Sequence, residues 1–187
     1  MRVITGTARG RKLIALEGQD VRPTTDKVKE AVFSIVQFDI EGSEVLDLFA
    51  GSGQLGIEAL SRGASRCTFI DSSQKSVKVI NENIRTTGFA ESSSVLNTDS
   101  IGYLRTCRLK FDLAFLDPPY EKGLLEQALP LLEKCMSDRG IVVCEHEQKL
   151  VLPEEYGRLK KSKTYKYGKI EVTVYRIPFG DDLSDDE

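Results

Sequence analysis

A four-residue motif in the middle of the chain, Asp117-Pro118-Pro119-Tyr120, combines a carboxylate, a rigid bend and an aromatic ring. The two prolines fix a rigid bend that has no donor amides and leaves backbone carbonyls as acceptors beside the Asp117 carboxylate. Two such acceptors would grip the N–H groups of a nucleobase amine and stabilise the positive charge that develops when the amine is methylated. Tyr120 would stack on the base and keep it aligned. The motif indicates amine methylation, although an isolated proline pair would indicate only a turn.

A glycine-rich segment, residues 47–56, precedes this motif and could hold the methyl donor. Gly51, Gly53 and Gly56 have the spacing GxGxxG, which alone is a weak indication of a dinucleotide site. Asp47 discriminates between ligands, because a carboxylate at the base of the loop would repel a pyrophosphate. The same carboxylate suits S-adenosylmethionine, which carries an ammonium and a sulfonium. We therefore assign Asp47, Gly51, Ser52 and Gly53 to S-adenosylmethionine binding.

Two further acids follow the next two expected strands. Asp71 is placed to accept hydrogen bonds from ribose hydroxyls, and Asp99 with Ser100 could take an adenine amino group. A structural reading treats Asp47 and Asp99 as turn and helix-cap residues instead. Three acids at three successive strand ends favour the cofactor role.

The elements that position these residues alternate between strands and helices. Seven strands are expected, at residues 45–49, 67–70, 94–96, 111–116, 141–144, 156–164 and 169–176. Helices are expected near 25–36, from the glycine loop to about 63, over 73–87 closed by Gly88, after residue 99, and over 123–135. This alternation predicts an α/β fold with a mostly parallel sheet covered on both faces. Ligands of such sheets bind beyond the carboxyl ends of the strands, where the polar residues above fall.

The chain divides into three parts. Residues 1–41 are expected to form a β-hairpin with a basic loop, from extended pieces 2–5 and 12–16, followed by a helix capped by Thr25. Residues 42–180 form the alternating domain, and 181–187 form an acidic tail expected to be disordered.

Composition fits one soluble domain. The 187 residues are 40% hydrophobic and 29% charged, with no apolar run near the roughly 20 residues of a membrane span and no signal peptide, so a cytoplasmic location is expected.

The net charge is −3, but five acids lie in the tail and bases concentrate near the N-terminus and in a second basic cluster at 158–169. We assign Arg9, Arg11, Lys12 and Arg22 to phosphate contacts, with ordinary surface charge as the alternative.

Metal chemistry is not expected. Four scattered cysteines and a single histidine form no ligand pattern, so the cysteines are interpreted as reduced thiols, mostly in the core. His146, at the end of the fifth strand, could be a general base, but methyl transfer from a sulfonium needs little base catalysis. A structural or surface role is favoured.

Motifs along nearly the whole chain resemble a known family, the RsmD-type 16S ribosomal RNA guanine-N2 methyltransferases. They are RVI-x-G at 2–6, RGRKL at 9–13, RPTTDKVKE at 22–30, LDLFAGSG at 46–53, GIEALSRGA at 56–64, DPPY at 117–120 and YG at 167–168. The resemblance implies a Rossmann-like, S-adenosylmethionine-dependent class I methyltransferase with an N-terminal RNA-contacting hairpin. It implies catalytic roles for Asp117, Pro118 and Tyr120, and closure of the RPTTD segment over the site. The partner would be small-subunit ribosomal RNA or an assembling subunit, and a monomer is expected. The acidic tail and the absence of tryptophan depart from the family pattern.

Two other hypotheses stay open. A DNA adenine-N6 methyltransferase would share the DPPY motif, but 187 residues leave no room for a separate target-recognition region. A non-catalytic RNA-binding or assembly factor would share the fold, but Asp117 and the glycine loop are intact.

Overall fold

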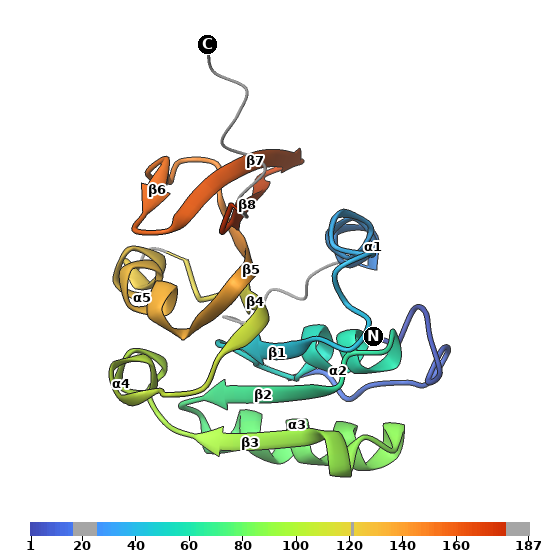
Figure 1. The fold of residues 1–187 in the computed structure, drawn as a ribbon. Helices are drawn as coiled ribbons and strands as arrows, with labels where there is room; N and C mark the ends of the chain where they lie inside the picture. The colour runs from blue at the N-terminus through green and yellow to red at the C-terminus, as the bar shows by residue number, and fades with distance from the viewer. Residues whose placement is uncertain (17–25, 121, 179–187) are drawn as a thin grey trace.

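The computed structural model describes residues 1–16, 26–120 and 122–178, and these form one eight-stranded sheet with helices on both faces (Figure 1). The strand order is β3-β2-β1-β4-β5-β8-β7-β6. The strands are β1 (Glu44–Asp47), β2 (Arg66–Asp71), β3 (Ser93–Asn97), β4 (Phe111–Leu116), β5 (Met136–Glu147), β6 (Glu155–Tyr156), β7 (Leu159–Tyr167) and β8 (Ile170–Arg176). The first five run parallel, whereas β8 pairs antiparallel with β5 and β7. The order reverses between β1 and β4, and sheets of this kind bind ligands beyond the carboxyl ends of the strands at such a reversal.

Among the described residues, five α-helices cover the two faces of this sheet. They are α1 (Asp26–Ile35), α2 (Gln54–Ser61), α3 (Gln74–Thr87), α4 (Ser100–Thr106) and α5 (Leu124–Leu132), with short 3-10 turns at Ala90–Ser92 and Glu133–Cys135. Residues of α1, α2, α3 and the N-terminal segment pack in one core cluster, and those of α4 and α5 pack in the other. The predicted Rossmann-like α/β architecture is confirmed.

Helix α3 shows how local sequence sets the element boundaries. Ser73 caps its first turn by accepting a hydrogen bond from the Ser76 amide at 3.3 Å. Gly88 ends it in the left-handed conformation, with φ at 86° and its amide bonded to the Ile84 carbonyl at 2.9 Å. The predicted bounds of this helix are confirmed.

Three details differ from expectation. The sheet has eight strands and not seven, because Glu155–Tyr156 pairs briefly with Leu159 and Lys160 before the chain turns at Gly157. Strand β5 begins at Met136, five residues early, since the polar residues before Ile141 are absorbed in a register shift against β4. The N-terminal hairpin contains a single antiparallel bridge, between Arg2 and Lys12, and no extended ladder. The Thr25 cap and the acidic tail lie outside the described residues.

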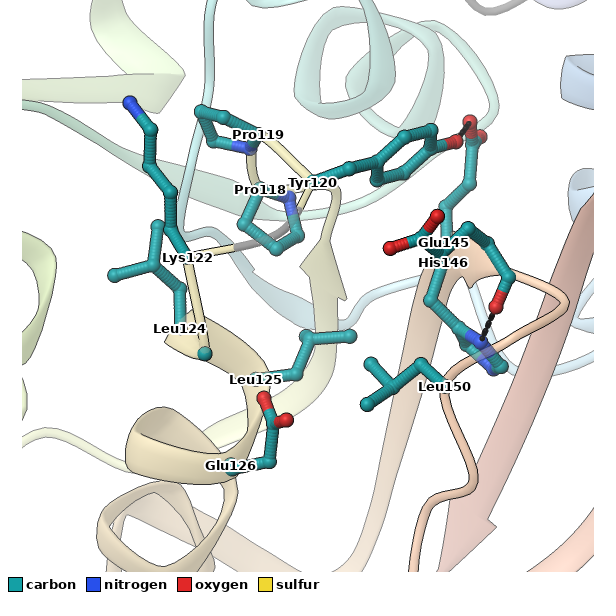
Figure 2. A pocket seen from close by; sticks show the side chains of 12 residues that line it. Pro118, Pro119, Tyr120, Lys122, Leu124, Leu125, Glu126, Glu145, His146 and Leu150 are labelled. Carbon is teal, nitrogen blue, oxygen red and sulfur yellow. Dashed lines mark hydrogen bonds between the residues drawn. The ribbon is translucent and has the colours of Figure 1, made fainter.

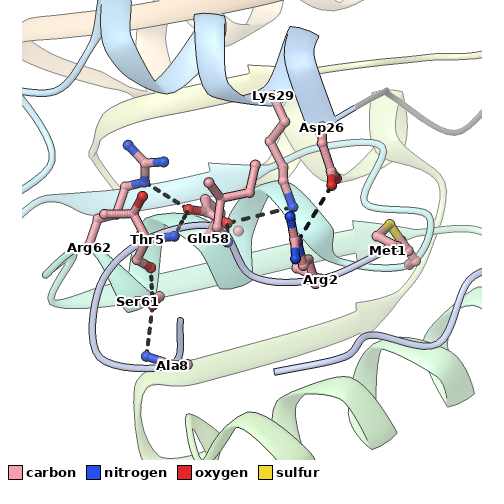
Figure 3. Close-up of polar contacts among 12 residues, drawn as sticks. Met1, Arg2, Thr5, Ala8, Asp26, Lys29, Glu58, Ser61 and Arg62 are labelled. Atoms are coloured by element: carbon pink, nitrogen blue, oxygen red, sulfur yellow. Dashed lines mark hydrogen bonds and ion pairs between the residues drawn. The ribbon is translucent and has the colours of Figure 1, made fainter. Parts of the chain in front are cut away.

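Helix α2 holds the N-terminal segment in place (Figure 3). Glu58 accepts hydrogen bonds from the amides of Ile4 at 2.8 Å and Thr5 at 3.0 Å. Ser61 accepts one from the Ala8 amide at 3.0 Å and donates to the Thr5 carbonyl at 2.6 Å. These contacts satisfy backbone groups that have no ladder partner.

Gly6 allows this close approach. Its φ is +86°, and a Cβ built there would lie 1.7 Å from the Ser61 carbonyl oxygen. Any side chain would therefore push the segment off α2. The N-terminal segment is thus fixed to the helix that begins at the glycine loop.

A buried ion pair adds α1 to this assembly. Lys29 Nζ lies 3.6 Å from Glu58 Oε2, both side chains are fully buried, and Lys29 also donates to the Arg2 carbonyl at 2.6 Å. Arg62 completes the cluster by donating to Glu58 Oε1 at 2.9 Å. Burial lowers the pKa of Lys29, while the nearby Glu58 carboxylate opposes that change.

Candidate active site

Asp71 links the glycine loop to the start of α3. Its Oδ2 accepts from the Gly51 amide at 2.8 Å, and its Oδ1 accepts from the Ser73 amide at 2.8 Å. The side chain is half-buried, and a carboxylate has about four acceptor sites, so it has capacity for ligand hydroxyls as well. Gly51 and Gly53 both adopt positive φ, at 57° and 78°, which lets the loop turn tightly before α2.

Asp47 lies under this loop. It is 2% exposed, and its Oδ2 accepts from the Gly56 amide at 3.0 Å, which fastens the first turn of α2 to the end of β1. Burial raises the pKa of Asp47 to about 7, and the nearby Asp71 adds to this, while the Gly56 amide opposes it. Its direct contact with a cofactor stays a prediction.

Gly56 is required for packing. A Cβ at this position would lie 2.3 Å from Phe69 Cε1 and 2.6 Å from Cys67 Sγ. The third glycine of the GxGxxG spacing therefore lets α2 lie directly on β2.

The predicted cofactor residues Asp99, Ser100 and Ser52 have structural roles. Asp99 caps α4, because its Oδ2 accepts from the Gly102 amide at 2.6 Å. The buried Ser100 hydroxyl donates to the Leu48 carbonyl at 2.7 Å, and the Ser52 carbonyl accepts from Asn83 Nδ2 at 2.9 Å. Asp99 remains exposed at the sheet edge, and its adenine contact stays a prediction.

The DPPY motif follows β4 at the same edge of the sheet. Asp117 and Tyr120 are half-buried, Pro118 is buried and Pro119 is exposed. The motif borders an open pocket of about 360 Å³, counting the solvent at its mouth, between the motif, α5 and the end of β5 (Figure 2). The predicted catalytic and cofactor residues thus come from adjacent strand ends, in the order that the sheet imposes.

Sequence reasoning missed Glu145. Its Oε1 accepts a hydrogen bond from the Tyr120 hydroxyl at 3.3 Å, and Figure 2 shows the two side chains pointing toward each other. Glu145 lies within β5, one residue after Cys144, and Asp117 comes one residue after Leu116, the register partner of Cys144 in β4. Only the pairing of β4 with β5 relates Glu145 to the DPPY motif, and no local feature of the sequence marks this residue.

His146 has two partners on the opposite side of the strand. Its Nδ1 lies 2.9 Å from the Glu147 carbonyl oxygen and its Nε2 lies 2.8 Å from Thr173 Oγ1. Because a carbonyl oxygen only accepts hydrogen bonds, Nδ1 is the protonated nitrogen and donates a hydrogen bond to the Glu147 backbone carbonyl. With 2% exposure and both nitrogens engaged, His146 serves to join β5 to β8.

The predicted RNA contacts lie on the surface of the N-terminal segment. Arg9 and Lys12 are exposed, and exposed Arg11 donates through Nη1 to the Thr86 carbonyl at 2.6 Å. Arg22 lies outside the described residues. In the second basic cluster, carboxylates already pair with Arg158, Lys160, Lys161 and Lys166.

Within residues 1–16, 26–120 and 122–178, no group of three His, Cys, Asp or Glu side chains could hold a metal ion. None of the helices there is long and apolar enough to cross a membrane.

The sheet order, the glycine loop and the strand-end carboxylates define the class of Rossmann-like methyltransferase folds. The solved structure of the Escherichia coli protein yhhF matches with a TM-score of 0.85 and 31% identity, covering 95% of this chain and 97% of that one. An RNA methyltransferase from Salinibacter ruber, solved with S-adenosyl-L-homocysteine, shares the fold at a TM-score of 0.64 and 20% identity, covering 89% of this chain and all of that one.

The chain belongs to the family described as Conserved hypothetical protein 95, whose model matches residues 1–176. Proteins named ribosomal RNA small subunit methyltransferase D are relatives. The one from Haemophilus influenzae is 38% identical, with 94% of this chain and 93% of that protein covered, and the one from Escherichia coli K12 is 36% identical, with 94% and 89% covered. The resemblance to the RsmD-type family is confirmed.

Proposed function

We propose that this protein transfers a methyl group from S-adenosylmethionine to the exocyclic N2 amine of one guanine in small-subunit ribosomal RNA. The observation that carries the proposal is the placement of Asp117 and Asp71 on one sheet edge, at the ends of β4 and β2, on either side of β1. An amine-gripping motif and a ribose-binding carboxylate then lie on either side of the carboxyl end of β1. The names of the relatives support the substrate class.

The residues at the end of β1 fit S-adenosylmethionine, which when bound supplies an electrophilic methyl group on a sulfonium. Asp71 would hold ribose hydroxyls with the acceptor capacity left by its two backbone donors. Gly51, Ser52 and Gly53 would present the loop backbone, and Asp99 with Ser100 would meet the adenine. Asp47 would act from beneath, by fixing the loop and by adding negative charge near the cationic end.

The DPPY motif would prepare the acceptor amine. The Asp117 carboxylate and the Pro118 carbonyl would each accept one N–H of the guanine 2-amine, which favours a pyramidal nitrogen with an available lone pair. Tyr120, tied to Glu145, would stack on the base and fix its plane. The proton that the amine loses after transfer would pass to Asp117 or to water.

Residues 1–41 would contact the RNA, and residues 42–180 would form the catalytic domain. Arg9, Arg11 and Lys12 lie exposed on a segment that α2 holds in place, and Arg22 is assigned with them. A fixed basic segment can meet phosphates without an ordering cost. We expect a cytoplasmic monomer that meets ribosomal RNA or an assembling subunit.

The test supplies purified protein and labelled S-adenosylmethionine with three substrates: naked small-subunit ribosomal RNA, assembled small subunits and DNA. Substrates come from cells that lack this methylation, and digested nucleosides are identified by mass spectrometry. N2-methylguanosine at a single position supports the proposal. N6-methyladenosine in DNA would favour the DNA enzyme, and cofactor binding without any methylated product would favour an assembly factor.

A further inference from the structure

We propose that Glu145 determines the base specificity of the site, by accepting the N1–H of the target guanine while Asp117 holds the neighbouring 2-amine. The inference rests on the proposed function, and it assigns the guanine preference to one residue outside the DPPY motif. Glu145 would touch the base directly and not act only through Tyr120.

The sheet register brings the two carboxylates to neighbouring positions along the chain of adjacent strands. Leu116 of β4 pairs with Cys144 of β5, Asp117 directly follows Leu116, and Glu145 directly follows Cys144. Neighbouring strands are about 4.8 Å apart, and register partners share a face of the sheet. Two acceptors at this spacing can meet two adjacent donors on one edge of a base.

Guanine offers two such donors, N1–H and the 2-amine, on its Watson–Crick edge. Adenine carries an unprotonated N1 beside its amine, and an ionised carboxylate can only accept hydrogen bonds. A carboxylate facing that N1 would bring two acceptors together without a proton between them. Glu145 would therefore favour guanine and reject bases with a bare N1.

Burial makes this discrimination strong. Glu145 is 7% exposed, and its bond to the Tyr120 hydroxyl at 3.3 Å is long for an O–H donor. A carboxylate in such a position is stabilised by each further donor it gains, because little solvent reaches it. The Tyr120 contact also fixes the acceptor relative to the ring on which the base would stack.

The test compares RNA that carries guanine or 2-aminopurine at the methylated position. 2-Aminopurine keeps the 2-amine but has a bare N1. The unaltered protein should methylate the guanine RNA about 10–100 times faster, the usual range for one well-placed base contact. Glu145→Gln should bring the two rates within about threefold, because an amide can accept from N1–H or donate to a bare N1. Because 2-aminopurine also lacks O6, the rate difference in the unaltered protein does not isolate N1. The informative quantity is the change in the guanine-to-2-aminopurine rate ratio from the unaltered protein to Glu145→Gln.

Three variants separate direct recognition from other roles. Glu145→Asp keeps an acceptor-only group and should keep the guanine preference. Tyr120→Phe should slow both substrates equally, since it removes the tie to Glu145 and leaves the carboxylate. Glu126→Gln, on α5 at the same pocket, is the matched control and should leave both rates unchanged.

Several results would overturn the inference. One is a Glu145→Gln variant that still methylates guanine with an unchanged guanine-to-2-aminopurine rate ratio. Another is the same change of that ratio in Tyr120→Phe. A third is equal rates on both RNAs for the unaltered protein, a measurement that does not depend on the folding of any variant. In each case N2-methylguanosine still forms, so the proposed function survives. An unaltered protein that makes no N2-methylguanosine would overturn both.

Discussion

Glu58 and Lys29 form an ion pair with no exposed side-chain surface, 3.6 Å apart, between α2 and α1. The same carboxylate receives the amides of Ile4 and Thr5 and the guanidinium of Arg62. One side chain thus joins the N-terminal segment, α1 and α2.

Glu58→Gln should lower the free energy of unfolding by about 3–5 kcal/mol, because it leaves the buried Lys29 ammonium without its counter-charge. Urea unfolding followed by circular dichroism measures this. Glu82→Gln, at an exposed pair with Arg85 on α3, is the control and should change stability little. The double variant Lys29→Met with Glu58→Gln should recover part of the loss, and no recovery would contradict the uncompensated charge as its cause.

Asp47 should make stability depend on pH. Its pKa is about 7 in the folded protein against 3.8 for the ordinary group, so the folded state binds the proton more tightly. The stability that the tightly bound proton adds to the folded state is fully present below pH 4 and is lost as pH rises to about 7. The free energy of unfolding changes by at most roughly 4 kcal/mol over this range. Asp47→Asn, whose amide oxygen can still accept from Gly56, should gain stability relative to the parent across that range. Parallel pH profiles for the two proteins would contradict the assignment.

The fold was largely predictable because its signals are local. Ser73 and Gly88 set the two ends of α3 through contacts with residues close to them in the sequence. The positions of the strand-end acids could be predicted because each acid follows a short apolar run. The role of Glu58 in joining three segments was not predictable, since nothing in the sequence around a charged helical residue indicates partners more than 50 positions away. Glu145 was not predicted for the same reason, because only the β4–β5 register relates its position to that of Asp117.

Asp117→Ala should reduce methyl transfer by about 10²–10³-fold, the usual effect of removing one preorganised electrostatic contact. Asp117→Asn should retain more activity, since its amide oxygen still accepts one N–H of the amine. Single-turnover methylation of small-subunit ribosomal RNA measures both rates, and calorimetry with S-adenosylhomocysteine should show nearly unchanged binding. An alanine variant as fast as the parent would exclude the amine-gripping role.

Asp71→Ala should weaken S-adenosylhomocysteine binding by about 2–4 kcal/mol, through lost ribose contacts and a loosened Gly51 amide. Isothermal titration calorimetry measures this loss. Glu82→Gln, on the exposed face of the adjoining helix, serves as the control. Unchanged affinity in the Asp71 variant would remove that residue from the cofactor site.

Replacing Arg9 and Arg11 with alanine should weaken RNA binding at low salt and leave the protein folded, because both side chains are exposed. Each lost phosphate contact should reduce the slope of log affinity against log salt by roughly 0.7–0.9. Filter binding at several salt concentrations measures the slope. Arg66, the first residue of β2, and Arg108, shortly before β4, are equally exposed and give a matched double-alanine control. Equal slopes for the two double variants would assign the N-terminal arginines to structure alone.

The lysines of β7 bear on how copies of the chain behave toward each other. β6 covers only Leu159 and Lys160, so among the described residues no further strand pairs with β7 on that side. An open strand edge is a template for pairing with another chain, and lysines along it oppose that pairing by charge repulsion. Lys163 and Lys166, on the uncovered part of β7, would bring like charges together if two such edges met. Substituting them with threonine should therefore promote aggregation at high protein concentration before it alters methylation.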